Sequence, residues 1–138
     1  MTGMSELHRH TAPDRERLIQ RIEAALAPRQ EVVFALVFGS FLHQDAFHDI
    51  DLAIWTTASA DPRADIALAA ELSASIGLPV DARRINDAPV AFLFHALRGR
   101  PVLVRDPQLL ADVMERTARD YHDRAPLLAR ATREAFAR

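Results

Sequence analysis

The sequence predicts an α/β (α+β) fold in which helices pack on a mixed sheet of about four strands and the C-terminus is helical. Short apolar runs of strand length alternate with segments whose apolar residues recur at the spacing of amphipathic helices. After the last apolar run, the remaining residues have a helical pattern. The chain has 138 residues, so we expect a single domain over residues 1–138.

The N-terminal part is expected to hold a frayed segment and then one helix. Residues 1–12 are polar and lack periodicity, which is typical of a frayed terminus. Residues 13–27 carry apolar side chains at helical spacing. Pro13 suits the first turn of this helix, and Pro28 ends it because proline cannot continue the backbone hydrogen-bond pattern.

Two apolar runs flank the segment that carries the functional prediction. Residues 31–38 are apolar without alternation, so we expect a strand that is buried on both faces. Gly39 ends this strand, and Ser40 is expected to cap a short helix. A second strand is predicted over residues 51–56.

Helices and strands alternate in the second half of the chain, and proline and glycine mark their ends. Asp61 and Pro62 are typical of a helix start, and Gly77 of a helix end. Pro101 favours an edge strand because its nitrogen cannot donate a hydrogen bond, and Pro126 is expected to break or kink the last helical stretch. The predicted elements are a helix over residues 61–76, a strand over 78–84, a helix over 90–98, a strand over 101–105, and helices over 107–123 and 126–138.

The composition excludes several classes of function. A net charge of −2 and a pI of about 6.3 argue against a general nucleic-acid binder, so no direct contact with nucleic acid is expected. The chain has no cysteine, which excludes disulfides and thiolate metal sites. All 17 cationic side chains are arginine, so chemistry that needs a lysine is excluded as well. No signal peptide or spanning helix is visible, and a cytoplasmic protein without membrane contact is expected.

Gly39 and Ser40 form the first part of a candidate site. A glycine after a buried strand allows a tight turn and a close approach of a ligand to the backbone. Ser40 would lie at the N-terminus of a short helix, where free N–H groups and the helix dipole favour an anion such as phosphate. A Gly-Ser pair alone is most often a simple turn, so the prediction depends on nearby residues that could act with it.

Two carboxylates stand at the entry of the second predicted strand. Asp49 and Asp51 point to the same side of an extended chain, while Ile50 between them points to the other. Like charges side by side are unfavourable unless a cation lies between them, and oxygen ligands select a hard ion, Mg²⁺ or Mn²⁺. An isolated Asp-x-Asp is more often a solvated turn. The Gly-Ser pair before it instead favours a site that holds phosphate and metal.

Asp81 is the candidate third carboxylate. It lies in the predicted strand over residues 78–84 and faces Asp49 and Asp51 if that strand lies beside the second one. Three carboxylates can hold two metal ions about 3.5–4 Å apart, one on phosphate and one on an attacking hydroxyl. Asp81 would then accept the proton of that hydroxyl.

Together these residues resemble the minimal nucleotidyltransferase (MNT) family of the DNA polymerase β-like superfamily, whose motif is Gly-Ser, a spacer, Asp-x-Asp and a later acidic residue. Residues 80–89 and 98–106 are also similar to segments of that family, and the resemblance extends over residues 31–106. The spacer is shorter than in most relatives, and His43 and Gln44 stand where many of them have arginine and glycine. The resemblance implies a single nucleotidyltransferase-type domain.

The resemblance also implies a reaction and a set of roles. An acceptor hydroxyl attacks the α-phosphate of a nucleoside triphosphate, and pyrophosphate leaves. The catalytic and metal-binding residues would be Asp49, Asp51 and Asp81. Gly39 and Ser40 would bind the nucleotide, with Mg²⁺ or Mn²⁺ as cofactor and ATP as substrate.

The acceptor is suggested by a narrower resemblance, to the MNT antitoxins that pair with HEPN ribonuclease toxins and transfer AMP from ATP to a tyrosine of the toxin. Few residues come after the last predicted strand, so an added acceptor domain is not expected; the acceptor site lies in a homo-oligomer or on a partner protein. The leading hypothesis is an antitoxin that acts as a protein adenylyltransferase on a HEPN-type toxin. The alternatives are a non-catalytic antitoxin that neutralises its partner by contact, and a small-molecule nucleotidyltransferase.

Overall fold

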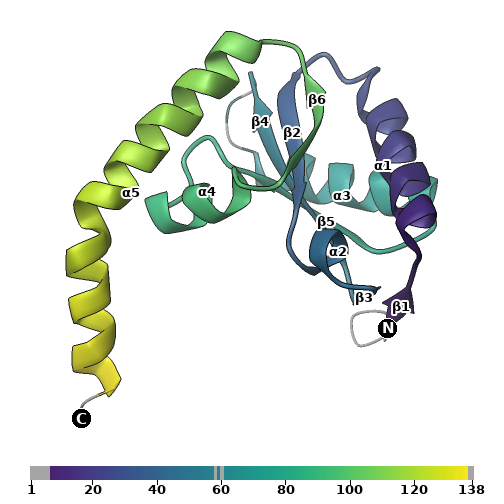
Figure 1. The fold of residues 1–138 in the computed structure, drawn as a ribbon. Coiled ribbons are helices and arrows are strands. Elements are labelled where there is room, and N and C mark those ends of the chain that lie inside the picture. Colours follow the sequence, from purple (N-terminus) through teal and green to yellow (C-terminus); the bar gives the residue numbers. More distant parts are fainter. Residues whose placement is uncertain (1–6, 58, 60, 137–138) are drawn as a thin grey trace.

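A mixed sheet of four strands forms the centre of the protein, whose computed structural model describes residues 7–57, 59 and 61–136. In sheet order the strands are β5 (Val80–Arg84), β4 (Ile50–Thr56), β2 (Val32–Phe38) and β6 (Arg100–Val104). β2 pairs antiparallel with both β4 and β6, whereas β4 and β5 are parallel. The predicted α/β fold with a mixed four-stranded sheet is therefore confirmed (Figure 1).

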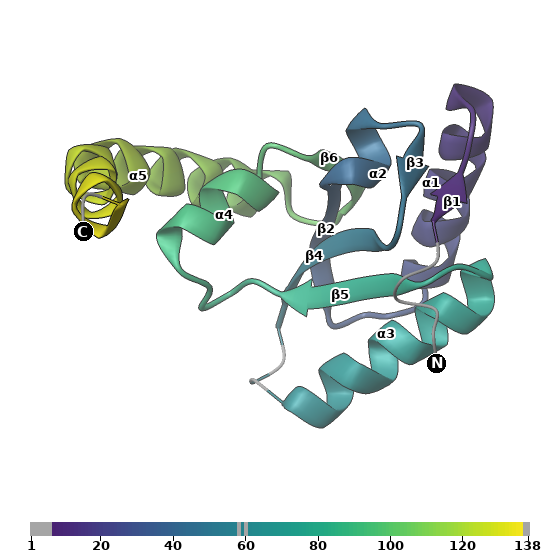
Figure 2. The ribbon, with the colours of Figure 1, turned by 90° about the horizontal axis from the view of Figure 1, so that it is seen from below.

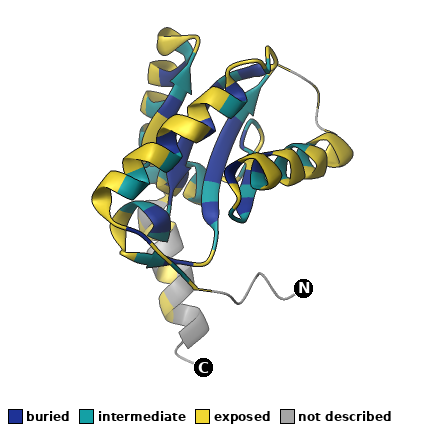
Figure 3. Cartoon of the chain, turned by 90° about the vertical axis from the view of Figure 1, so that its right-hand side faces the viewer, coloured by how far each residue is buried: buried dark blue, intermediate teal, exposed yellow. Residues whose placement is uncertain are grey.

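Helices cover both faces of this sheet (Figures 1 and 2). On one face, α1 (Ala12–Leu26) and α3 (Pro62–Ile76) share an apolar cluster with the sheet. On the other face, α4 (Val90–Ala96) and the first part of α5 (Pro107–Phe136) contribute to a second cluster. Figure 3 shows that buried residues concentrate along the strands between these helices.

β2 lies between β4 and β6, and both of its faces are covered, which explains the uninterrupted apolar run in the sequence. Ala35 and Val37 point into the cluster under α1 and α3, while Phe34, Leu36 and Phe38 point into the cluster under α4 and α5. Successive side chains of a strand point to opposite faces, so a strand covered on both faces must be apolar at every position. The predicted burial of this strand on both faces is confirmed.

Helix caps and prolines set several boundaries where the sequence predicts them. Asp61 caps α3 by accepting a hydrogen bond from the N–H of Arg63, and Gly77 ends that helix at a left-handed φ of 83°. Pro101 lies in β6, which is an edge strand, as expected for a residue that cannot donate to a neighbouring strand.

The expectation that residues 1–12 are frayed is wrong for the part that the structure describes. β1 (His8–Arg9) pairs with β3 (Ala46–Phe47), and His10 is buried against two aromatic rings. Residues 1–6 lie outside the described residues. An imidazole can pack its ring in a core while a ring nitrogen makes a hydrogen bond, so a polar composition does not reveal this anchoring.

The predicted division of the C-terminal stretch into two helices is also wrong. α5 is continuous from Pro107 to Phe136 and contains Pro126. Figure 1 shows that this long helix bends along its length. A proline removes one hydrogen bond and bends the axis, but the bonds on either side continue the helix. Among the described residues, no helix is long and apolar enough to cross a membrane.

We expect Phe47→Ala to lower the free energy of unfolding by about 3–5 kcal/mol, because truncation of a buried phenylalanine leaves a cavity. Phe47 is 1% exposed and packs edge-on against Phe41 and His10. Urea unfolding followed by circular dichroism measures the change. Leu127→Ala is the matched control, because Leu127 is 67% exposed and should change stability by less than about 0.5 kcal/mol. Equal effects of the two substitutions would contradict the assignment of Phe47 to the core.

Candidate active site

The parallel pairing of β4 with β5 brings Asp51 and Asp81 together. The two are register partners, so their side chains leave the sheet on the same face. Asp49 lies just before β4, and Ile50 between the carboxylates is fully buried. The condition set by the sequence, that the strand of Asp81 lies beside that of Asp51, is therefore met.

The electrostatics of Asp51 indicate that Asp81 and Asp49 are each close enough to influence it. The pKa of Asp51 is raised above its ordinary value, first by partial burial and then by the negative charges of Asp81 and Asp49. Arg83 and His95 act in the opposite direction. Arg83 also forms an ion pair with Asp81 over 3.1 Å. Arg83 and His95 only partly offset this effect, because the pKa of Asp51 stays raised. A further cation at the carboxylates would therefore reduce the remaining repulsion.

Gly39 lies against Asp51 and cannot be replaced without moving it. The backbone of Gly39 has a φ of 83°, and a Cβ placed there would lie 2.6 Å from Oδ2 of Asp51. Gly39 occupies the cap position of α2 (Ser40–His43), so Ser40 is the first helical residue and not the cap that the sequence predicts. The difference comes from the backbone, because a positive φ at the cap position is accessible to glycine and strained for serine.

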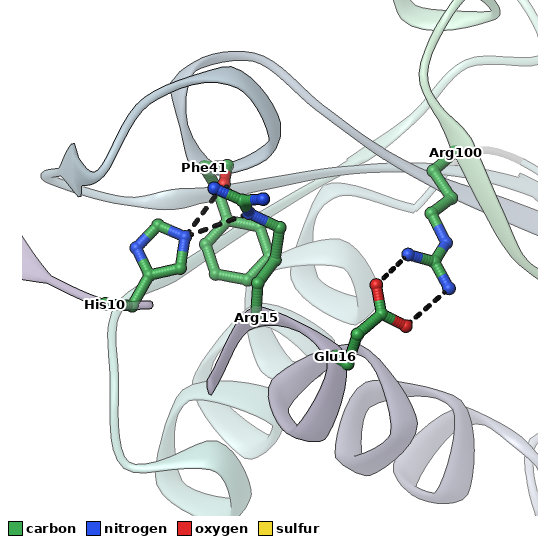
Figure 4. Close-up of polar contacts among 5 residues, drawn as sticks. All are labelled: His10, Arg15, Glu16, Phe41 and Arg100. Atoms are coloured by element: carbon green, nitrogen blue, oxygen red, sulfur yellow. Dashed lines mark hydrogen bonds and ion pairs between the residues drawn. The ribbon is translucent and has the colours of Figure 1, made fainter. Parts of the chain in front are cut away.

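The short helix α2 is held in place by the N-terminal segment (Figure 4). Nε of Arg15 donates to the carbonyl oxygen of Phe41 over 3.1 Å, and Nε2 of His10 lies 3.2 Å from the same oxygen. The rings of His10 and Phe41 are stacked at 5.0 Å. Because Phe41 is the neighbour of Ser40, this arrangement fixes the turn that carries Gly39 and Ser40.

A second contact ties β6 to α1 on the same side of the molecule. Arg100 forms a bidentate ion pair with Glu16, in which Nη2 of Arg100 donates to Oε1 of Glu16 over 2.8 Å (Figure 4). Gly99 precedes β6 and packs so closely on β2 that an added Cβ would lie 2.2 Å from the carbonyl oxygen of Val37. The turn between α4 and β6 is therefore fixed beside the end of β2, next to Gly39.

A cavity of about 290 Å³ opens beside this turn. It is lined by Phe38, Gly39, His43, His95, Arg98 and Gly99. Sequence reasoning did not assign His95 or Arg98 to the site. Both lie in or just after α4, far along the chain from Gly39. Arg98 begins the segment 98–106 that resembles the family, but that resemblance does not show that the segment lies against Gly39.

A divalent cation fits the chemistry of the carboxylate group. Within the described residues, no three His, Asp or Glu side chains are already arranged to hold an ion. Mg²⁺, however, commonly takes only one or two protein carboxylates, with phosphate and water completing its shell. The donor set is all oxygen, which suits such an ion, and a bound cation would stabilise the ionised form of Asp51 against the burial and the negative charges that raise its pKa.

The chain matches a family model described as "Polymerase beta, Nucleotidyltransferase" over residues 20–108. It also resembles solved structures at low sequence identity. A chain of the MntA–HepT toxin–antitoxin crystal structure has a TM-score of 0.67 and 16% identity, with 85% of this chain and 98% of that chain covered. A complex of a tri-AMPylated Shewanella oneidensis HEPN toxin with an MNT antitoxin gives a TM-score of 0.65 and 17% identity, covering 86% and 98%. A toxin–antitoxin structure with AMP-PNP gives 0.67 and 18%, covering 83% and 98%. No curated protein matched the sequence.

We expect Asp51→Asn to raise the urea midpoint of unfolding at pH 7.5 in metal-free buffer. A carboxylate whose pKa is raised by folding contributes stability only while it is protonated, and that stability is lost as pH rises through the folded pKa. Asparagine mimics the protonated form, so the advantage of the variant should disappear at a pH below the ordinary pKa of an aspartate, about 3.9. Asp123→Asn, at an exposed position of α5, is the control and should show no such pH-dependent advantage. A variant less stable than the wild type at pH 7.5 would contradict the assigned repulsion.

Proposed function

The chain belongs to the polymerase beta nucleotidyltransferase family, and we propose that it transfers AMP from ATP to a hydroxyl group of a partner protein. The observation that carries this proposal is the group formed by Asp51 with Asp81 and Asp49, directly against Gly39. A partly buried carboxylate group of this kind is costly unless it serves to hold a cation. The missing side chain of Gly39 lets Asp51 lie directly against the turn that leads into α2.

The residues of the site would bind the metal, bind the nucleotide and accept a proton in this reaction. Asp49 and Asp51, with Asp81, would hold Mg²⁺ or Mn²⁺, which when bound neutralises phosphate charge and polarises the α-phosphate. Gly39, at the cap position of α2, and Ser40, the first residue of that helix, would bind the nucleotide. Asp81 accepts the proton of the attacking hydroxyl. The acceptor oxygen forms a bond to the α-phosphorus as the bond to the leaving pyrophosphate breaks.

The proposed partner is a HEPN-type toxin, and the protein would act as its antitoxin. Support comes from the similar structures, which include an AMPylated HEPN toxin in complex with an MNT antitoxin and a toxin–antitoxin structure with AMP-PNP. The chain covers nearly the full length of the matched chains, at 98% in both cases.

A non-catalytic antitoxin is the second candidate. It is favoured by the ion pair between Arg83 and Asp81 over 3.1 Å, because Asp81 then already has a cationic partner within the chain. In that case the protein would neutralise the toxin by contact, and the carboxylates would contribute nothing to inhibition.

We expect α-labelled ATP and Mg²⁺ to label a cognate HEPN-type toxin in the presence of this protein. Asp49→Asn/Asp51→Asn should remove the label, because the carboxylates that would hold the ion are lost. Asp81→Asn should slow transfer by roughly 10²–10⁴-fold, the usual contribution of a general base. The initial rate of labelling measures both effects, and Asp123→Asn on α5 is the control that should leave it unchanged.

The same assay separates the two candidates. A toxin that stays unlabelled but is still inhibited by the Asp49→Asn/Asp51→Asn variant would establish the contact mechanism. Labelling of an added small-molecule alcohol in place of the toxin would point to a small-molecule nucleotidyltransferase.

A further inference from the structure

We propose that a cavity beside the N-terminal part of α1 binds a small organic oxyanion, that is, a carboxylate carried on an apolar body. The cavity measures about 380 Å³ and is lined by residues of β1, α1 and β3 together with His10 and Leu78. This volume lies within the roughly 300–1,000 Å³ that small-ligand pockets occupy. None of the described residues that line it belongs to the carboxylate group or to the cavity beside Gly39, so the inference goes beyond the proposed function and is independent of it.

The ring of His10 supplies a buried hydrogen-bond donor that has no acceptor. Only 8% of His10 is exposed, and Nε of Arg15 donates to its Nε2 over 3.1 Å (Figure 4). The carbonyl oxygen of Phe41, 3.2 Å from Nε2, accepts from the same N–H of Arg15. Because an arginine N–H faces Nε2, this nitrogen must offer a lone pair, and the proton of the ring is on Nδ1.

This donor calls for an acceptor that the chain does not supply. Nδ1 of His10 is buried and has no hydrogen-bond partner among the described residues. His10 is one of the residues that line the cavity. A buried donor without an acceptor is costly, so a ligand that brings an acceptor oxygen would remove an unfavourable feature of the fold.

His8 adds a second nitrogen without a partner next to the first. His8 and His10 are two residues apart, and both rings pack against Phe47, with ring centroids 5.6 Å and 4.8 Å away. Nε2 of His8 is also buried without a partner in the part of the chain that the structure describes. Both histidines line the cavity. Two such nitrogens at one cavity suit a ligand with several acceptor positions, such as a carboxylate.

Arginine side chains give the cavity an excess of positive charge. Arg9, Arg17 and Arg21 line it, together with one carboxylate, that of Asp14. Asp14 forms an ion pair with Arg17, so its charge is already balanced. Within residues 7–57, 59 and 61–136, Arg9 forms no ion pair, and Arg21 donates to the carbonyl oxygen of Ser75 over 2.9 Å. The charges of Arg9 and Arg21 are therefore available to an anion.

The rest of the lining is apolar, which suits an organic anion better than an inorganic one. Leu18, Phe47 and Leu78 line the cavity. A phosphate ion would leave these side chains against water, whereas the apolar body of an organic acid would cover them. A metal ion is not favoured, because no three His, Asp or Glu side chains in the described part of the chain are placed to hold one.

His10 connects the cavity to α2. An acceptor at Nδ1 would favour the form of the ring that carries its proton there. That form leaves the lone pair of Nε2 for Arg15, which also holds the carbonyl oxygen of Phe41. A bound oxyanion would therefore stabilise the contact that fixes α2.

We expect nitrogen NMR of the histidine rings in the full chain at pH 7.5 to reveal the site, with benzoate as the probe. The ring of His10 should carry its proton on Nδ1, and benzoate should shift the ring signals of His8 and His10 with a Kd of about 1 mM, as expected for a ligand of this size. Benzyl alcohol has the same ring without the charge, and inorganic phosphate has the charge without the apolar body. Each should bind at least about fivefold more weakly.

Variants with exposed side chains separate ligand binding from a loss of structure. Arg9→Gln and Arg21→Gln should each weaken benzoate binding by about threefold or more, because each removes a charge from the cavity. His8→Phe keeps an aromatic ring on Phe47 and removes the ring nitrogens, so it should weaken binding as well. Arg63→Gln, at an exposed position of α3, is the matched control and should bind benzoate like the wild type. Thermal unfolding checks that each variant is folded.

Saturable shifts of both histidine rings that Arg9→Gln and Arg21→Gln weaken would support the oxyanion site. A lack of any shift, equal benzoate binding by the wild type and all three variants, or equally tight binding of benzyl alcohol or phosphate would overturn it. A proton on Nε2 of His10 would overturn it too, because Nδ1 would then need a donor. The label-transfer assay tests the proposed function separately, so either proposal can fail without the other.

Discussion

The parallel pairing of β4 with β5 is the constraint on which the candidate site depends. It places Asp81 in register with Asp51 and so assembles carboxylates that are far apart in the sequence. The helix α3 makes this pairing possible, because two parallel strands need a crossover between them. Its apolar residues Leu72 and Ile76 pack against the sheet. The packing of the core therefore holds Asp51 and Asp81 together although their negative charges repel each other.

Close backbone packing does the rest of the positioning. Gly39 and Gly99 lie in turns where there is no room for a side chain. A side chain at Gly39 would clash with Asp51, and one at Gly99 would clash with the backbone of β2. Arg15 and His10 hold the carbonyl of Phe41 from the N-terminal segment. The turns at Gly39 and Gly99, next to the carboxylates on β4 and β5, are thus fixed by contacts on two sides. Such preorganisation is what charge stabilisation in phosphoryl transfer requires.

The fold can be predicted largely from local patterns, and the errors of that prediction have physical causes. β2 is recognisable because a strand covered on both faces is apolar throughout, and α3 because its cap residues and Gly77 are specific signals. The pairing of His8 and Arg9 with β3 and the burial of His10 are hidden in the sequence, because they depend on β3 and on Phe41. Pro126 does not end α5, since one missing hydrogen bond bends a long helix without stopping it.

The sequence by itself determined the chemical types at the centre of the site: a glycine and serine after a buried strand, the Asp49 and Asp51 pair, and Asp81 on a later strand. Local spacing suffices to bring Asp49 near Asp51, because the two are only two residues apart at the start of β4. Only the tertiary structure decided that Asp81 meets Asp51, and that His95 and Arg98 line a cavity with Gly39. Those juxtapositions arise from strand pairing and helix packing between distant segments, which no local pattern encodes.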